Sequence, residues 1–268
     1  MSLLATTLPV GFAVADSHTH IDMPAFDQDR EAVMARAREA GVSDLLIAGG
    51  VDAEDGHHRA LRVAEQFGVP VSAGIHPHEA KLATEAIYDE LEGLAREGRV
   101  VAIGEVGLDF HYDYSPREVQ REVFRRQVRL ARDVGRPLII HTREADEESA
   151  SILEEEGARE TGGVIHCFTG GEELARRALD LGFFISFSGI VAFPRAETIQ
   201  AVARTVPEER LLVETDSPFL APPPHRGKRN EPAFVVEVAR KVASLRGTTA
   251  EAVGAAARRN FERLFRRA

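Results

Sequence analysis

The sequence is poor in several residue types that would indicate a particular class of protein. It has no tryptophan and only one cysteine, Cys167, and aromatic residues make up 6% of the chain. A single cysteine cannot form an internal disulfide bond, which excludes a disulfide-stabilised fold and agrees with a reducing cytoplasm. No stretch of about 18 consecutive apolar residues exists, so we expect no spanning helix and no membrane partner. The segment 1–9 lacks a basic start and is too short for a secretory signal, which favours a cytoplasmic location.

Positive charge is also in deficit. The chain has 43 acidic and 33 basic residues, a formal net charge of −10. Broad, non-specific binding to nucleic acid needs a positive surface field, and this composition argues against it. A small cationic site on an acidic protein is still compatible with the sequence, because divalent ions would reverse the local sign. Net charge alone therefore leaves a nucleic-acid substrate open.

What the sequence does contain is a regular alternation of short apolar runs with longer segments of helical period. This pattern is typical of βα units and a parallel sheet. Strands are expected at about 10–16, 43–48, 69–75, 100–105, 136–141, 163–167, 183–188 and 210–215. Helices are expected at 28–40, 54–67, 79–97, 116–133, 144–157, 171–181 and 195–205, with two more at the end of the chain. In 268 residues these elements predict an α/β fold, a (β/α)₈ TIM barrel forming a single domain over 1–268, with an open doubly wound sheet as the alternative.

Metal-binding residue types stand at the ends of five of these expected strands. The carboxyl ends of barrel strands meet around one axis, so residues far apart in sequence converge there. His18 and His20, two apart on an extended segment, point to the same face and can bind one ion. We therefore predict a metal centre built from His18, His20, Glu105, His141, His166 and Asp216.

The composition of this set indicates its chemistry. Six nitrogen and oxygen donors without a thiolate exceed the needs of one structural zinc and suit two divalent ions roughly 3.5–4 Å apart. The expected cofactor is two divalent ions per chain, Mg, Mn or Zn. Glu105 is the candidate bridge; the other ligands divide into His18, His20 and Asp216 at one ion and His141 with His166 at the other. Asp216 is also a candidate general base for the attacking water, so Asp216 and Glu105 are the candidate catalytic residues.

Further residues are candidates for substrate contacts. His76, near the expected barrel mouth, is a candidate for a phosphate contact, with a packing role as the alternative. Arg226, Lys228 and Asn230 lie in a loop after the last strand, where such barrels often bind phosphate, and a solvated loop is the alternative.

Phe110, Tyr112 and Tyr114 follow the fourth expected strand. They are candidates for stacking on bases, and packing is an equal alternative. Asp109, in the same region, is expected to orient its neighbours rather than to bind metal.

Several motifs together resemble the TatD family of metal-dependent deoxyribonucleases. They are His18-x-His20, Gly104-Glu105-x-Gly107-Leu-Asp109, His141, His166-Cys-Phe, Glu214-Thr-Asp216-Ser-Pro218, Gly74-Ile-His76-Pro-His78 and Arg226-Gly-Lys-Arg-Asn-Glu231-Pro. The resemblance runs in order from residue 16 to about 262. It implies a barrel of the amidohydrolase group, the same six ligands, and hydrolysis of DNA phosphodiester bonds. A 3′→5′ exonuclease that prefers single strands or frayed ends, with a role in DNA repair, is the expected activity.

A different reaction on the same barrel is the main alternative. A metal-dependent amidohydrolase or esterase would cleave an amide, ester or lactone, for example an aminoacyl-tRNA ester. Many such enzymes bridge their metals with a carboxylated lysine, but the three lysines here, Lys81, Lys228 and Lys241, are not at strand ends. The position of Glu105 favours the nuclease. A binding protein with a vestigial site would have lost ligands, and none is lost.

Overall fold

The structure is a computed structural model that describes residues 12–51, 55 and 57–265. Its strands form one parallel eight-stranded sheet in the order of the sequence. They are β1 (Val14–Thr19), β2 (Val42–Gly50), β3 (Val71–Gly74), β4 (Ala102–Asp109), β5 (Leu138–Arg143), β6 (Gly163–Ile165), β7 (Phe184–Phe187) and β8 (Leu211–Val213). A bridge between Thr19 and Ser217 joins the end of β1 to the segment after β8, which closes the barrel.

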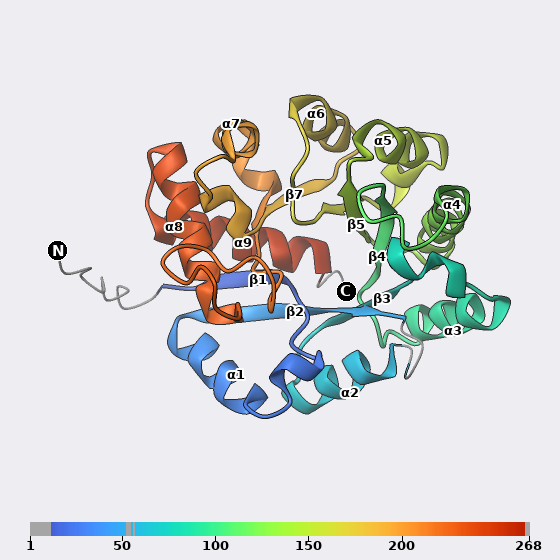
Figure 1. The fold of residues 1–268 in the computed structure, drawn as a ribbon, viewed down its shortest axis with the longest axis horizontal. Helices are drawn as coiled ribbons and strands as arrows, with labels where there is room; N and C mark the ends of the chain where they lie inside the picture. Colours follow the sequence, from blue (N-terminus) through green and yellow to red (C-terminus); the bar gives the residue numbers. More distant parts are fainter. Residues whose placement is uncertain (1–11, 52–54, 56, 266–268) are drawn as a thin grey trace.

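Helices surround the strands, as Figure 1 shows. They are α1 (Arg30–Glu39), α2 (His58–Phe67), α3 (Glu85–Arg96), α4 (Arg117–Val134), α5 (Asp146–Glu155), α6 (Glu172–Asp180), α7 (Glu197–Thr205), α8 (Val235–Arg246) and α9 (Ala250–Phe265). The prediction of a (β/α)₈ barrel is confirmed. The single-domain assignment stays a prediction. Within the described ranges, no helix is long and apolar enough to cross a membrane.

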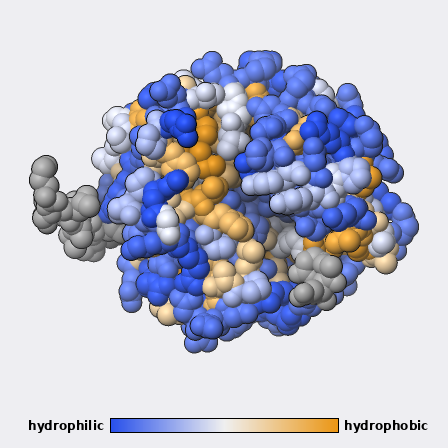
Figure 2. Space-filling model, viewed as in Figure 1, coloured by the Kyte–Doolittle hydropathy of each residue, from blue (hydrophilic) through white to orange (hydrophobic). Residues whose placement is uncertain are grey.

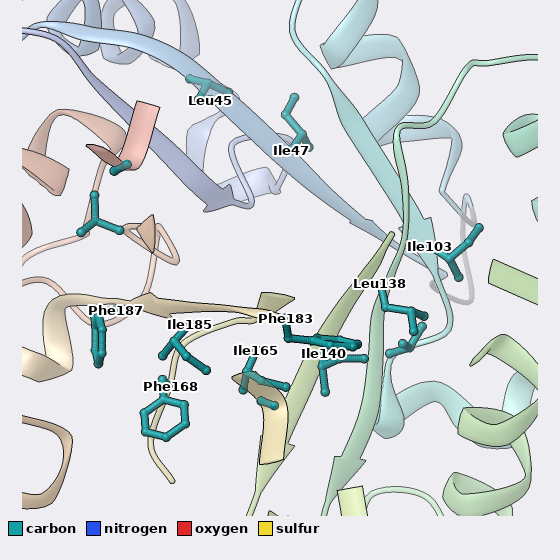
Figure 3. Close-up of a cluster of buried hydrophobic side chains, with 14 of the residues drawn as sticks. Leu45, Ile47, Ile103, Leu138, Ile140, Ile165, Phe168, Phe183, Ile185 and Phe187 are labelled. Atoms are coloured by element: carbon teal, nitrogen blue, oxygen red, sulfur yellow. The ribbon is translucent and has the colours of Figure 1, made fainter. Parts of the chain in front are cut away.

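Successive side chains along each strand point to opposite faces of the sheet, so the core has two layers. In β6 and β7, Ile165 and Ile185 belong to the layer between strands and helices, part of which Figure 3 shows. Val164 and Phe184, one residue earlier, belong to the layer inside the barrel. Side chains of α9, including Phe261, pack into this inner layer. A packed interior leaves the carboxyl ends of the strands as the place for a site.

The helix expected at 79–97 is a 3-10 helix (Pro77–Leu82) followed by α3, and the strand boundaries differ from the expected ones mainly at β1 and β4. Residues 10 and 11 of the expected first strand lie outside the described residues, and β1 extends to Thr19, so that His18 is inside the strand. Its polar residues are buried because they bond to the segment after β8: Asp16 accepts hydrogen bonds from the backbone and hydroxyl of Thr215. β4 likewise runs four residues past Glu105 to Asp109. The first polar residues in the sequence therefore predict that these two strands end earlier than they do.

Candidate metal centre

Five strands bring the predicted ligands together at the carboxyl end of the barrel. On one side, His18, His20 and Asp216 form a group whose ligand atoms lie within 4.8 Å of one another. The Nε2 atoms of His18 and His20 are 3.2 Å apart, and Asp216 Oδ1 lies 3.4 Å from His20 Nε2. Asp216 is held there because its backbone N–H donates to the carbonyl of His18.

Glu105 stands between this group and a second one. Its Oε2 lies 3.3 Å from Nε2 of His18. Its Oε1 lies 2.8 Å from Nδ1 of His141 and 2.7 Å from Nε2 of His166. The two oxygens of one carboxylate thus face different imidazoles, Oε2 that of His18 and Oε1 those of His141 and His166, as a bridging ligand would, although His18, Glu105 and His166 also form one group of possible ligands.

Three of these imidazoles have a hydrogen-bond acceptor outside the cluster next to their outer nitrogen. His20 Nδ1 lies 3.1 Å from the carbonyl of Ala48, which can only accept, so Nδ1 carries the proton. His141 and His166 each lie between two carboxylates: when the nitrogen nearer Glu105 binds a metal ion, Nε2 of His141 can donate to Asp109 and Nδ1 of His166 to Glu214. In the neutral ring the other nitrogen then presents its lone pair to the centre, as a metal ligand must.

These lone pairs face other electron-rich atoms. His166 Nε2 is buried without a hydrogen-bond partner although it lies close to Glu105, and Nδ1 of His141 faces the same oxygen. Lone pairs and carboxylate oxygens repel one another unless a positive charge lies between them. A donor set of imidazoles and carboxylates suits divalent zinc or manganese, so the residues present fit metal ions.

The carboxylates increase the affinity of the imidazoles for positive charge. Burial would lower the pKa of His20, but the hydrogen bond and negative charge of Asp216 raise it to about 9. Burial would raise the pKa of Glu105, but positive charge on the imidazoles around it, His166 and His76 first, lowers it well below its usual range when these rings are protonated. Glu105 is therefore ionised and available as a ligand.

His76 lies at the edge of the cluster in a different role. Its Nδ1 accepts a hydrogen bond from the backbone N–H of His78, and its Nε2 lies 3.3 Å from Oε1 of Glu105. Burial would lower the pKa of His76, but the charges and hydrogen bonds of Glu105 and Glu79 raise it to about 9. Nε2 carries a proton both in the protonated ring and in the neutral ring that accepts at Nδ1. His76 thus presents a hydrogen-bond donor to the centre, which suits a substrate oxygen better than a metal ion.

Two carboxylates hold the ligands from outside. Glu214 accepts from His166 and from the backbone N–H of Cys167. Asp109 accepts from both His141 and His78 through Oδ2, as expected of a residue that orients its neighbours. Sequence reasoning missed the role of Glu214, and its position two residues before Asp216 was the available signal.

The predicted substrate loop is only partly directed at the centre. Arg226 is exposed and lies over the ring of Phe193 at 3.8 Å, and Lys228 is exposed. Asn230 is fully buried, and its side-chain nitrogen donates to the carbonyls of Thr215 and Phe219. This amide holds the loop after β8 in place, so Asn230 is positioned to support the site rather than to contact a substrate.

A barrel of eight parallel strands with such donors at their carboxyl ends defines a class, the metal-dependent hydrolases. A family model described as TatD related DNase matches residues 15–266. The chain is 42% identical to the metal-dependent hydrolase YabD of Bacillus subtilis (strain 168), over 94% of this chain and 98% of the relative. It is 37% identical to the 3′-5′ ssDNA/RNA exonuclease TatD of Musicola paradisiaca, over 94% and 97%.

A solved structure agrees. That of YJJV, a TatD homologue from Escherichia coli K12, aligns with a TM-score of 0.88 at 30% identity, covering 95% of this chain and 98% of that one. The chain belongs to the TatD family, and it is a metal-dependent hydrolase of that family. The resemblance found in the sequence is confirmed.

Proposed function

We propose that this protein hydrolyses DNA phosphodiester bonds as a 3′→5′ exonuclease that acts on single strands or frayed ends with two divalent ions. The observation that carries the proposal is Glu105, whose two oxygens face different imidazoles, Oε2 that of His18 and Oε1 that of His141. Relatives named 3′-5′ ssDNA/RNA exonuclease, such as that of Pantoea ananatis at 36% identity, support a nucleic-acid substrate.

Each residue has a defined part in this reaction. His18, His20 and Asp216, which form one group of possible ligands, would hold one ion. His141 and His166, which both approach Oε1 of Glu105, would hold the other, and Glu105 would contribute to both. When bound, such ions activate water and neutralise the charge that develops on the phosphate.

Asp216 and His76 handle protons around the phosphate. Burial would raise the pKa of Asp216, but the hydrogen bond and charge of His20 keep it low, so its carboxylate can accept the proton of the attacking water. His76 donates from Nε2 to a phosphate oxygen.

The location of the site explains the preference for single strands. The ligands lie at the ends of barrel strands, and His18, Glu105 and His166 are buried. An intact duplex is too wide to bring its phosphate to this depth. Arg226 and Lys228, exposed in the loop after β8, would contact flanking phosphates. Action in the cytoplasm on damaged or frayed DNA, as in DNA repair, is part of this proposal.

A metal-rescue assay tests the proposed function. Protein treated with a chelator is supplied with Mg²⁺, Mn²⁺ or Zn²⁺ and incubated with end-labelled single-stranded DNA, duplex DNA and RNA. Stepwise release of nucleotides from the 3′ end that returns with metal, and that Glu105→Ala abolishes while its circular dichroism is unchanged, is the expected result. Activity that persists without metal, or near-normal turnover of the Glu105→Ala protein, contradicts it.

A further inference from the structure

Within the described ranges, three large hydrophobic side chains are exposed, and all three surround the candidate metal centre. Tyr112, Tyr114 and Phe219 are 45%, 57% and 48% exposed. Figure 2 shows a mainly hydrophilic face crossed by an apolar band. Exposed apolar groups gathered at a site commonly mark a surface that a ligand covers. The function proposed above does not use these rings.

On the β8 side, Phe219 is fixed relative to the first group of ligands. Its ring lies 6.1 Å from the ring of His20, at an angle of 70°. Its backbone N–H donates to the carbonyl of Asp216, and its carbonyl accepts from the side chain of Asn230. The backbone that carries the ring is therefore held by a short turn that begins at a candidate ligand.

On the β4 side, two tyrosines form a platform next to the second group. The rings of Tyr112 and Tyr114 are stacked at 5.3 Å with an angle of 14° between them, and Tyr114 contacts His78 edge-on at 4.8 Å. Lys81 donates to the carbonyl of Tyr114, and Asp109 accepts from the backbone N–H of Tyr112. The stacked rings leave no room for a base between them, so the outer surface of Tyr114, the more exposed ring, is the available platform.

The two platforms stand on opposite sides of the centre. In a closed barrel of eight strands in sequence order, β4 and β8 are four positions apart and thus face each other. A continuous row of ring contacts crosses the centre between them: Phe219, His20, His18, His166, His141, His76, His78 and Tyr114. A phosphate bound to the ligands in this row has an exposed aromatic ring on each side.

We propose that Tyr114 and Phe219 form a stacking clamp, each ring covering the base of one of the two nucleotides joined by the scissile phosphate. This inference rests on the proposed nuclease function and names its substrate contacts. Aromatic rings stack on bases of any sequence, because every base has a π-face. A base within a duplex is already stacked on both faces, so the clamp selects unpaired ends. It also explains how an acidic protein retains a polyanion with few cationic contacts.

Position-specific fluorescence tests the clamp. Short oligodeoxynucleotides carry 2-aminopurine either at the 3′ nucleotide or at the one before it, with a phosphorothioate in the terminal linkage to slow hydrolysis. Stacking quenches 2-aminopurine, and the chain has no tryptophan to obscure its emission. Phe219→Leu and Tyr114→Leu remove a ring but keep apolar bulk, while Phe219→Tyr and Tyr114→Phe keep the ring as matched controls.

We expect each leucine variant to lose quenching at one labelled position only and to bind about tenfold more weakly, since one stacked base contributes roughly five- to a hundredfold. The ring-preserving variants should behave as the wild type.

Three results overturn the clamp: the leucine variants quench at both positions as the wild type does, each leucine variant loses quenching equally at both positions, or the wild type does not bind the oligonucleotide. Hydrolysis of the natural oligonucleotide, measured in parallel, separates the two proposals. Turnover without position-specific quenching overturns the clamp alone, and position-specific quenching without turnover overturns the proposed reaction alone.

Discussion

Asp216 combines an unusual backbone conformation with a chemical role. Its φ of 56° lies in the left-handed region, which aspartate and asparagine tolerate better than most residues. A change to asparagine therefore preserves the local backbone and keeps one oxygen as a ligand, while it removes the ability to accept a proton.

We expect Asp216→Asn to lower turnover about 10²- to 10⁴-fold, the usual contribution of a general base, with a smaller effect on DNA affinity. Single-turnover kinetics with saturating metal, together with equilibrium dialysis for metal content, measures both. A variant that loses affinity but keeps its turnover shows that the carboxylate is not the base.

The protonation of His20 makes metal binding dependent on pH. Its pKa in this site is raised to about 9 from 6.5, so below about pH 9 a metal ion must displace a proton from the ring. Apparent affinity should therefore rise with pH, about tenfold per unit for each displaced proton, and level off above about pH 9. Titration with Mn²⁺ followed by electron paramagnetic resonance between about pH 6.5 and 9 measures this, and an affinity that is constant over that range contradicts it.

At the scale of elements, the close contact of β4 with β5 places Glu105 next to His141. Gly107 has a φ of 144°, and a Cβ there would collide with the carbonyl oxygen of His141. An alanine would push the two strands apart at a candidate ligand.

We expect Gly107→Ala to weaken metal binding at least tenfold and to lower the melting temperature. Gly93→Ala is the matched control, because Gly93 lies in α3 with no atom near its added Cβ, and this change should stabilise the helix by about 0.5–1 kcal/mol. Calorimetry with and without metal compares the two variants. Equal behaviour of both would show that the strand contact does not position the site.

The N-terminal caps of two helices differ from those that the sequence patterns predict. The pattern Thr248-x-x-Glu251 predicts that Thr248 caps the last helix, but Thr249 accepts the capping hydrogen bond from Ala252. The backbone N–H of Thr248 instead donates to Ala243 at the end of α8. Ser115 precedes Pro116, a pattern that predicts an N-cap followed by a first-turn proline, but its hydroxyl donates to the carbonyl of His78. In each case a tertiary or neighbouring contact competes with the local motif.

Across the whole molecule, the sequence was most informative where one physical rule acts on every repeat. Buried parallel strands alternate with amphipathic helices, so the barrel and the convergence of His18 with Asp216 follow from periodicity. The tautomers of the histidine rings cannot be predicted from this periodicity, because they depend on contacts such as that of His20 with Ala48. The exposed ring of Phe219 also could not be found, since exposure is decided by the fold.

The net charge of −10 predicts how the proposed substrate is held. Binding should involve about two to four phosphate contacts, each contributing roughly −0.7 to the slope of log affinity against log salt for single strands. Arg226→Ala should reduce the slope by about one contact. Fluorescence anisotropy over a salt series gives the slope, and a value corresponding to eight or more contacts would mean that the substrate covers a much wider surface.

The closure of the barrel also determines when during synthesis the protein becomes able to act. The side chains of Thr19 and Ser217, which join β1 to the segment after β8, are separated by 198 residues in the chain. The group of His18 and His20 lacks Asp216 until that residue has left the ribosome. For most of its synthesis a growing chain is therefore unable to assemble the complete proposed site.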